Sequence, residues 1–423
     1  MIRMATAPGK KQPVIQMSLL ALVSFLLGAI NDIGFDLVGE LYLVEPALVI
    51  VVVFLLATGK SGGAFRAQIF WGFMFAIMLT LVGYMISDLS VGTDSSQYLR
   101  GWGRVALLMA DCASLMILTA HNRQNLWWFM LGTGVGGILY LVANGVSIHT
   151  WKLGYGEPIS MLVLTLAPFL PKRLALLALA VFGALNIVLD YRILGAVFVT
   201  VAAIIWARPE HVDQSAISFV KYAKLAIIIA FGLIGIAAST LLTQDEYAAR
   251  RDASNVGRFA AITVAMRAIA DSPIIGYGSW TVNQKYADMV RREIEASRDR
   301  SLAQVQPLGS GSGFSAHSQI LQSWVEGGLL GAAFFFVYGY QLVRSIHWYS
   351  LRRPLDIFSS AFTFTLIINL WSWMASPFNG SGRIQIAMAV AVIAAATYDR
   401  HKKLRDSAQR EPAPRTAGFV QVR

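Results

Sequence analysis

The chain has 423 residues, of which 56% are hydrophobic and only 14% are charged. Its mean hydropathy of +0.56 argues against a soluble globular protein of this size. The apolar residues fall in blocks of about 15 to 20, close to the length of a helix that crosses hydrocarbon. Because these blocks are too long for barrel strands and do not alternate, they predict an all-α polytopic membrane protein.

Twelve apolar blocks predict transmembrane helices. The first follows a basic start and has no clear cleavage site, so we expect a retained helix and not a removed signal peptide. The expected spans are residues 13–30, 41–58, 69–87, 105–120, 126–144, 159–170, 174–189, 193–207, 225–243, 317–343, 356–376 and 385–398.

The distribution of Lys and Arg orients these spans. If the N-terminus is cytoplasmic, 21 of the 35 Lys and Arg residues fall on the cytoplasmic side. The other side has 14, and nine of these lie in one long loop, which is left out because long loops cross regardless of charge. The remaining ratio of 21 to 5 predicts that both termini are cytoplasmic and that the long loop is external.

This topology divides the chain into four parts, of which the external loop is the only large extramembrane segment. In that loop "RFAAITVAMRAIADSP" has apolar residues at helical spacing, and "YADMVRREIEASRDRSLAQ" predicts a second, charge-rich helix. The basic tail is expected to lie near anionic lipids. The parts are an N-terminal bundle of about nine helices (1–243), the loop (244–316), the C-terminal membrane helices (317–398) and the cytoplasmic tail (399–423).

The segment "SAHSQILQSWVEGGLLG" opens the tenth expected span with a histidine, which a helix that only crosses lipid would not need. With Ser315 as N-cap, His317 lies in the first turn, where the helix dipole disfavours a protonated imidazole. A neutral imidazole suits a general base, although an interfacial histidine explains the residue as well. Trp324, Gly328 and Gly331 share its helical face, and the glycines allow a neighbouring helix to approach closely.

Three arginines are candidate ligands for an anion, because a guanidinium binds phosphate through two parallel hydrogen bonds. Arg258, at the expected start of a loop helix, and Arg267 are nine residues apart and face opposite sides. For each of them, an exposed and solvated arginine is the plainer interpretation. Arg192 lies with Asp190 between two apolar blocks, where it indicates either a functional residue or a local ion pair that closes a turn.

Other polar residues in the apolar blocks are expected to bond between helices, namely Glu45, Asp111, Glu326 and Asn369. The turns "GYG" with Tyr277 and "FNGSGR" with Arg383 are further candidates to line a site. The six histidines are scattered without metal-ligand spacing. We therefore expect no metal, no cofactor and no nucleic-acid partner.

At these residues the chain resembles the bacterial O-antigen ligase and O-antigen (exopolysaccharide) polymerase family. "HSQILQSWVEGGLLG" fits the ligase pattern of a histidine, a small polar residue, nine residues, a glycine, two residues and a glycine. "GRFAAITVAMRAIADSPIIGYGSW" looks like the arginine-led helix before that motif, and "DYRILGAVFVTVAAII" looks like the arginine that opens an apolar helix. Ile193 replaces the small residue usual after that arginine. The three segments occur in the family's order within residues 180–345.

The resemblance implies a GT-C-like, metal-independent, inverting glycosyltransferase of the bacterial inner membrane that acts at the periplasmic face. Its donor would be a polyprenyl-diphosphate-linked oligosaccharide and its acceptor a lipid-linked glycan or lipid A-core, with polysaccharide-assembly proteins as further partners. Arg192 and Arg258 would bind the diphosphate, and His317 would activate the acceptor hydroxyl. The candidate substrate-binding residues are Arg267, Tyr277, Ser318, Trp324 and Arg383.

Two activities stay open within this family. "VGELYLVEPALV" and "LRGWGRVALL" look more like the N-terminal helices of exopolysaccharide polymerases, whereas the histidine motif favours a ligase. A transporter of lipid-linked glycans is the alternative from another class, favoured by the number of spans and the buried charges. Against it, the chain shows no two related halves, which transporters often have.

Overall fold

The computed structural model describes residues 17–36, 39–59, 63–207, 245–281, 283–297, 315–349 and 356–410. These residues form fourteen α-helices, which agrees with the expected all-α class. One small element was not expected, an antiparallel hairpin of β1 (Gly34–Asp36) and β2 (Glu40–Tyr42), in which Phe35 pairs with Leu41.

The helices follow the apolar blocks closely, and most boundaries differ from the expected ones by a few residues. The first group is α1 (Leu19–Ala29), α2 (Val44–Ala57), α3 (Gln68–Val91), α4 (Ser95–His121), α5 (Arg123–Ala143), α6 (Gly156–Leu166), α7 (Lys172–Val188) and α8 (Arg192–Ala207). The second is α10 (Asp245–Asp271), α11 (Gln284–Ser297), α12 (Gln319–Gly331), α13 (Ala333–His347), α14 (Ser359–Ala375) and α15 (Gly382–Arg410). Short turns of helix, η1 (Ala64–Arg66), η2 (Trp151–Tyr155), η3 (Ala167–Phe169) and η4 (Ser279–Thr281), join some of them.

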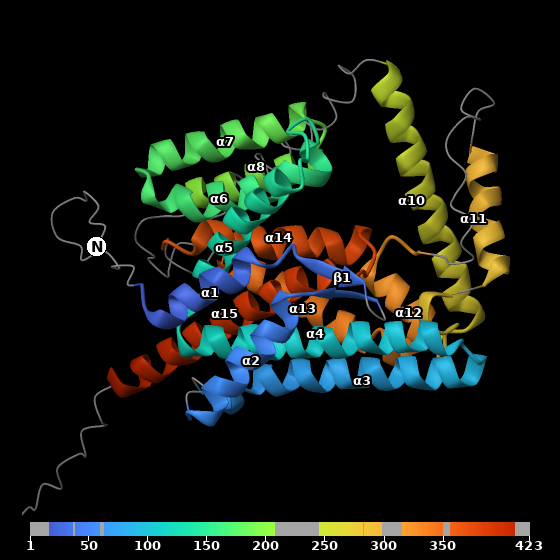
Figure 1. Ribbon diagram of the computed structural model, residues 1–423, viewed down its shortest axis with the longest axis horizontal. Coiled ribbons are helices and arrows are strands. Elements are labelled where there is room, and N and C mark those ends of the chain that lie inside the picture. Colours follow the sequence, from blue (N-terminus) through green and yellow to red (C-terminus); the bar gives the residue numbers. More distant parts are fainter. Residues whose placement is uncertain are drawn as a thin grey trace, which may run out of the picture.

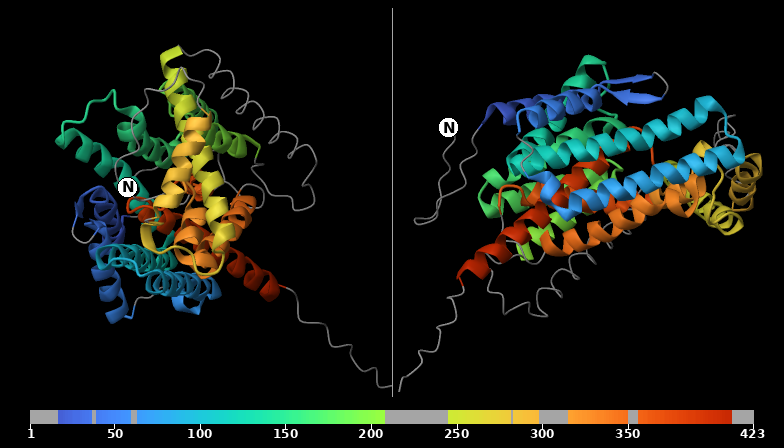
Figure 2. Two further views of the ribbon diagram at one scale, coloured as in Figure 1. Left: turned by 90° about the vertical axis from the view of Figure 1, so that its right-hand side faces the viewer. Right: turned by 90° about the horizontal axis from the view of Figure 1, so that it is seen from below.

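Most helices run along the long axis of the molecule, with α10 and α11 gathered at one end (Figure 1). The first described helix begins, and the last ends, at the opposite end, so we call the two ends the α10 end and the terminal end. The right-hand view of Figure 2 again shows the α10–α11 pair beyond one end of the bundle, and the left-hand view looks onto the pair from that end. Within the bundle α4 packs on α3 and α15, and α14 packs on α8, α13 and α15.

Three helices of the described chain, α3, α4 and α5, are each long and apolar enough to cross a membrane. The α12–α13 pair makes a fourth candidate if its two helices form one broken span. Shorter apolar helices include α1, α2, α6 with η3, α8 and the first part of α15. This composition is consistent with an all-α membrane protein. The expected total of twelve spans stays a prediction, and the ninth, 225–243, lies outside the described residues.

The tenth expected span is not one straight helix. Residues 317–343 were expected to cross as a unit, but α12 and α13 meet at an angle of 115°. Gly328, inside the last turns of α12, has φ 65° and ψ −162°, a region that is essentially restricted to glycine. A side-chain carbon there would lie 1.9 Å from the carbonyl oxygen of Ile274. The glycine therefore permits both the break and the approach of the chain at Ile274, neither of which a helical-wheel analysis anticipates.

Buried polar contacts join helices that are distant in sequence, as expected for three of the four embedded polar residues. Arg383 at the start of α15 bonds both carboxylate oxygens of Glu45 in α2, with N–O distances of 2.6 and 3.0 Å. Asn369 accepts a hydrogen bond of 2.9 Å from the Tyr338 hydroxyl, which links α14 to α13. Glu326 is bonded as described below. The tail expected from residue 399 begins as helix, because α15 continues to Arg410.

Candidate functional site at the α10 end

The α10 helix packs one apolar face against α11 and the region of α12. Its buried residues recur at helical spacing from Ala260 to Ile269, and they form a cluster with Tyr286 and Val290 of α11 and with Ala316 and Val325 near α12. The helix begins at Asp245, earlier than the expected start at 258. Arg258 therefore lies inside a continuous helix, and its side chain is half-buried at the edge of the apolar face.

A turn after α10 ties this helix to α12 through backbone bonds. Gly276 and Gly278 have φ values of 83° and 81°, which confirms the expected tight turn at "GYG". The amides of Tyr277 and Gly278 donate to the carbonyls of Val325 and Glu326 at 2.8 and 3.0 Å. Because these are carbonyls of the last turns of α12, the turn replaces hydrogen bonds that the break in the helix leaves unmade.

His317 lies directly before α12 and not in its first turn. The N-cap is Ser318, whose hydroxyl accepts from the Leu321 amide, so the expected cap at Ser315 was wrong by three residues. His317 has φ 47°, a left-handed conformation uncommon for a side chain larger than that of glycine or asparagine. The neighbouring Ala316 and Ser318 are each 1% exposed, whereas His317 is half-buried. The packed neighbours thus hold the imidazole at the end of the helix.

Arg258 lies near enough to His317 for its charge to act on the imidazole. Burial lowers the pKa of His317 below its ordinary value, and the positive charge of Arg258 lowers it further. The imidazole is therefore neutral at neutral pH, as expected, but for a different reason from the one given by the sequence. Desolvation and a neighbouring guanidinium, not a position inside the first turn, disfavour the protonated form. A neutral histidine beside a cation can accept a proton close to a bound anion.

Arg267 and Tyr277 face away from this pair toward α11. Arg267 is 54% exposed and forms an ion pair of 3.1 Å with Glu293. Because α10 is one continuous helix, the spacing of nine residues puts it on the opposite side from Arg258, as expected. The Tyr277 hydroxyl lies 2.6 Å from that of Tyr286. The Tyr286 hydroxyl also donates to Asp271, and hydrogen bonds from Lys285 and Tyr286 hold the pKa of Asp271 below its ordinary value. These contacts fasten α11 to α10.

Ser318 and Trp324 have contacts that position α12. Besides capping the helix, the Ser318 hydroxyl donates to the Trp373 carbonyl of α14 at 3.2 Å. The indole nitrogen of Trp324 donates to the Pro273 carbonyl at 2.8 Å, next to the turn that follows α10. The substrate contacts expected of both residues stay a prediction.

Arg192 and Arg383 belong to other elements. Arg192 is the first residue of α8, and its Nε lies 3.5 Å from Asp190, so the ion pair considered from the sequence is present. Asp190 itself has φ 59°, which closes the turn between α7 and α8. Arg383 is 3% exposed and is bonded to Glu45 and to the Glu40 carbonyl, so its contacts join α15 to β2 and α2. A substrate contact by either arginine stays a prediction.

A buried network around Glu326 was missed by the sequence analysis. Glu326 and Arg104 form an ion pair in which the side chains are 0% and 2% exposed. The Tyr84 hydroxyl donates to Glu326 at 2.7 Å, and Gln322 donates to its other oxygen at 2.9 Å. Arg104 also donates to the Phe378 carbonyl at 2.7 Å. The network joins α3, α4, α12 and the segment before α15, so it fixes the position of α12.

Two neighbouring residues of α3 form hydrogen bonds to the turn that follows α10. Asp88 accepts hydrogen bonds from the amide and hydroxyl of Ser279 at 2.6 and 2.8 Å. The Ser87 hydroxyl accepts from the Gly278 amide and donates to the Glu326 carbonyl. The sequence contained one usable signal, because Asp88 and Arg104 lie just outside the apolar blocks expected at 69–87 and 105–120. The true helices are longer at that end and include both residues.

The site is thus a half-buried His–Arg pair held at the end of a short, rigidly anchored helix in an all-α protein consistent with membrane insertion. In the described part of the chain no three His, Cys, Asp or Glu side chains are grouped closely enough to hold a metal ion. In comparisons with known proteins, no family model matches this chain, and no curated protein does either.

Proposed function

We propose that this protein is a bacterial inner-membrane glycosyltransferase that uses a polyprenyl-diphosphate-linked glycan as donor. The proposal includes twelve spans, cytoplasmic termini and a reaction site on the periplasmic side, at the α10 end. The observation that carries it is the half-buried His317, held directly before α12 between packed neighbours and within reach of the charge of Arg258. The resemblance of three segments to O-antigen ligases and polymerases supports it.

In this mechanism His317 takes the proton of the acceptor hydroxyl as that oxygen attacks the anomeric carbon. The bond from this carbon to the diphosphate breaks, and the diphosphate leaves with the bonding electrons. Arg258 and Arg192 stabilise the negative charge that develops on the leaving group, a role that guanidinium groups perform well in phosphate transfer sites. Attack opposite the leaving group inverts the anomeric centre. No metal or cofactor takes part in the proposal.

The direct test is transfer by purified protein in proteoliposomes, with a synthetic lipid-linked oligosaccharide as donor. Removal of a general base typically costs at least ~10²-fold, so His317→Ala should lose transfer to that extent. His149→Ala is the matched control, because His149 is exposed in the loop after α5. Wild-type transfer by His317→Ala, with the protein correctly folded, would reduce His317 to an interfacial residue.

The arginines are tested by lysine, which keeps the charge but cannot offer two parallel hydrogen bonds. Arg192→Lys and Arg258→Lys should be nearly as damaging as the alanine variants. If both lysine variants transfer at the wild-type rate, the arginines do not bind the diphosphate in this way.

A polymerase of O-antigen or exopolysaccharide is slightly favoured over a ligase. The two differ in what accumulates when the gene is deleted. Single lipid-linked repeat units indicate a lost polymerase, and long lipid-linked chains with unmodified lipid A-core indicate a lost ligase.

A transporter of lipid-linked glycans is the second candidate, because the 115° break between α12 and α13 is a feature of transporter helices that surround a substrate. The proteoliposome experiment separates the two functions. The transporter would be favoured if a fluorescent lipid-linked glycan crosses the bilayer equally well with wild type and His317→Ala. In that case neither protein should show glycosyl transfer, which would overturn the proposed enzyme.

A further inference from the structure

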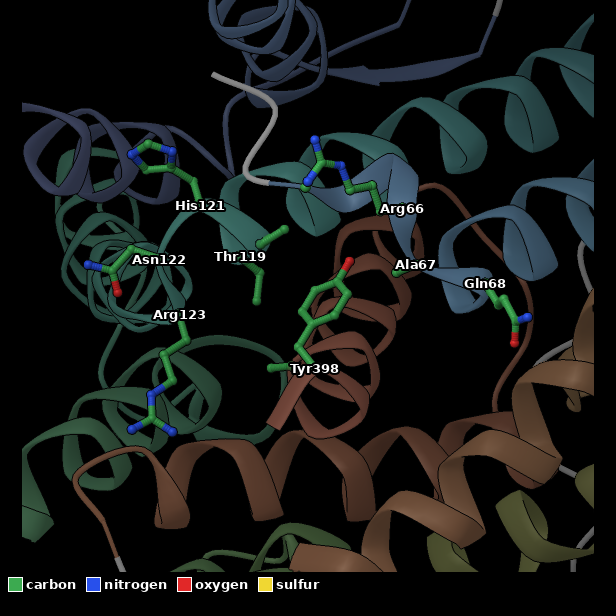
Figure 3. A pocket seen from close by; sticks show the side chains of 11 residues that line it. Arg66, Ala67, Gln68, Thr119, His121, Asn122, Arg123 and Tyr398 are labelled. Atoms are coloured by element: carbon green, nitrogen blue, oxygen red, sulfur yellow. The ribbon is translucent and has the colours of Figure 1, made fainter. Parts of the chain in front are cut away.

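A cavity of about 640 Å³ lies between elements at the terminal end of the bundle, opposite the α10 end (Figure 1), and Figure 3 shows side chains that line it. Its wall is formed by η1 with the start of α3, by the end of α4 and the start of α5, and by α15. The volume falls within the range of small-molecule sites, which is about 300 to 1,000 Å³. The charge count of the sequence predicts that this end is cytoplasmic.

The charge of the cavity favours an anion. Arg66, His121 and Arg123 line it, and none of the lining residues that the structure describes is Asp or Glu. Arg123 is held in place by Asp356 at 3.2 Å and by the ring of Phe358, 4.6 Å from its guanidinium carbon. Figure 3 shows Arg66 and Arg123 on opposite sides of the space, contributed by separate elements. An occupant that neutralises this wall carries negative charge.

One hydroxyl group at the cavity has no protein partner. The Tyr398 hydroxyl is buried, and no hydrogen bond satisfies it within the part of the chain that the structure describes. Figure 3 shows its oxygen directed from α15 into the space between Thr119 and Ala67. Because buried hydroxyl groups are normally satisfied, this donor is explained by a ligand oxygen. The start of α5, at Arg123, adds the positive end of a helix dipole.

Exposed aromatic side chains lie beside the basic wall of the cavity. Phe65 and Trp71, on either side of Arg66 and Gln68 in sequence, are 38% and 56% exposed. The Trp71 indole donates to the Phe65 carbonyl at 2.8 Å, which fixes an amphipathic ring beside the basic wall. Tryptophan is enriched where hydrocarbon meets headgroups. A headgroup phosphate could bind the basic wall while an acyl chain of the same lipid packs against these aromatic rings.

We propose that this cavity binds a phosphate ester, and that the phosphate is that of an anionic phospholipid in the cytoplasmic leaflet. Topology alone requires positive charge at this end but neither a cavity nor a buried, unsatisfied tyrosine hydroxyl. Arg66 contacts the phosphate oxygens, and Tyr398 donates a hydrogen bond to one of them, while Arg123 stays bonded to Asp356 in the wall. A soluble phosphate ester has the same chemistry and differs only in its source.

The test uses the purified full-length protein and two probes. Nanodiscs of phosphatidylglycerol in phosphatidylcholine report lipid retention by native mass spectrometry, and inorganic phosphate alone is titrated by calorimetry. A guanidinium that bonds a phosphate directly contributes more than the general attraction of a surface charge, so Arg66→Gln should bind about tenfold more weakly. Tyr398→Phe should also weaken binding while keeping the ring and the fold. Arg173→Gln, an exposed arginine at the start of α7 outside the cavity, is the matched control and should bind as the wild type does.

Preferential retention of phosphatidylglycerol, reduced in the two cavity variants, supports a lipid site. Binding of inorganic phosphate with the same dependence and no lipid preference supports a soluble phosphate ester. Equal losses in Arg66→Gln and Arg173→Gln would show general attraction to anionic lipid and overturn the proposal. Absence of both lipid preference and phosphate binding in the wild type would overturn it as well.

Discussion

The helix α12 has two polar centres that differ in how they are bonded. Near its end Glu326 is fully buried and is bonded to Arg104, Tyr84 and Gln322. Near its start His317 is half-buried, and in the described part of the chain no hydrogen bond engages its ring. The carboxylate of Glu326 thus forms its hydrogen bonds within the protein and holds the helix in place. In the function that we propose, the ring nitrogens of His317 are left to bond a substrate.

The largest effect is expected from breaking the first centre. Arg104→Ala leaves the carboxylate of Glu326 buried without its counter-charge, which typically costs about 3–5 kcal/mol. An ion pair that is exposed on a surface typically contributes only about 0–1 kcal/mol. The thermal midpoint of the detergent-purified protein should fall strongly. Lys285→Ala is the control, because its ion pair with Asp271 is largely exposed and should contribute little to stability.

The double variant Arg104→Met with Glu326→Leu sharpens this result. Replacing both members of a buried ion pair by apolar residues of similar size removes the unpaired charge. We therefore expect the double variant to be more stable than Arg104→Ala. A double variant as unstable as the single one would show that the bonds to Tyr84 and Phe378, and not the ion pair, hold the helices.

The next effect tests the break that separates α12 from α13. Gly328→Ala places a side chain in a glycine-only conformation and against the Ile274 carbonyl. Such backbone strain costs about 1–3 kcal/mol, and the close contact adds to it. Gly72→Ala in α3 is the control, since nothing lies within 4 Å of its added carbon and alanine favours helix. Equal stability of the two variants would contradict the described geometry.

A smaller effect concerns the pH dependence of the second centre. Because its pKa is lowered, His317 should remain an active base below pH 6.5, and the acid limb of kcat/KM should lie below that value. Arg258→Gln removes the positive charge but not the burial, so the limb should move to higher pH without reaching the ordinary value. Arg291→Gln, an exposed arginine paired with Asp288, is the control and should leave the limb in place.

The same shift has a defined sign for stability. The unfolded chain binds a proton to His317 more readily than the folded chain does, so the contribution of this residue is present above about pH 6.5 and is lost on acidification. If His317→Ala removes none of the acid sensitivity of unfolding, the histidine is not buried as described.

The smallest effect is expected at Arg267. Its ion pair with Glu293 is more than half exposed on the arginine side, so Arg267→Ala should change the free energy of unfolding by less than about 1 kcal/mol. Denaturation of the purified variant measures this directly. Transfer activity lost at unchanged stability would make Arg267 a substrate contact after all.

The sequence predicted the helices well because apolar blocks determine them, as α3 and α5 illustrate. It also predicted the opposite faces of Arg258 and Arg267, which depend only on helical spacing. It failed at Ser315 and Gly328, where the outcome depends on long-range contacts. Ser318 becomes the cap because it also bonds the Trp373 carbonyl, and the chain breaks at Gly328 because Ile274 approaches there.

The ion pair of Arg104 and Glu326 was unpredictable for a related reason. The two residues are separated by 222 positions in the sequence, and their role as an ion pair follows only from their burial side by side in the fold. Glu326 was expected to bond to another helix and does so, but nothing in a single sequence selects Arg104 as the partner. The proximity of His317 to Arg258 likewise depends on the packing of Ala316 against α10, which no local pattern specifies.

The shortness of α12 has a consequence for how the protein is made. With 13 residues it is about 20 Å long, less than the roughly 30 Å of hydrocarbon that an inserting segment must cross. The bonds that hold its end come from α3, α4 and the turn after α10, all of which leave the ribosome earlier. During synthesis those elements can therefore pack together first. The helix α12 can pack against them only after α13, which follows it, has emerged. A ribosome stalled between these two helices would leave Ser318, the residue after His317, without its bond to Trp373, which is synthesised later.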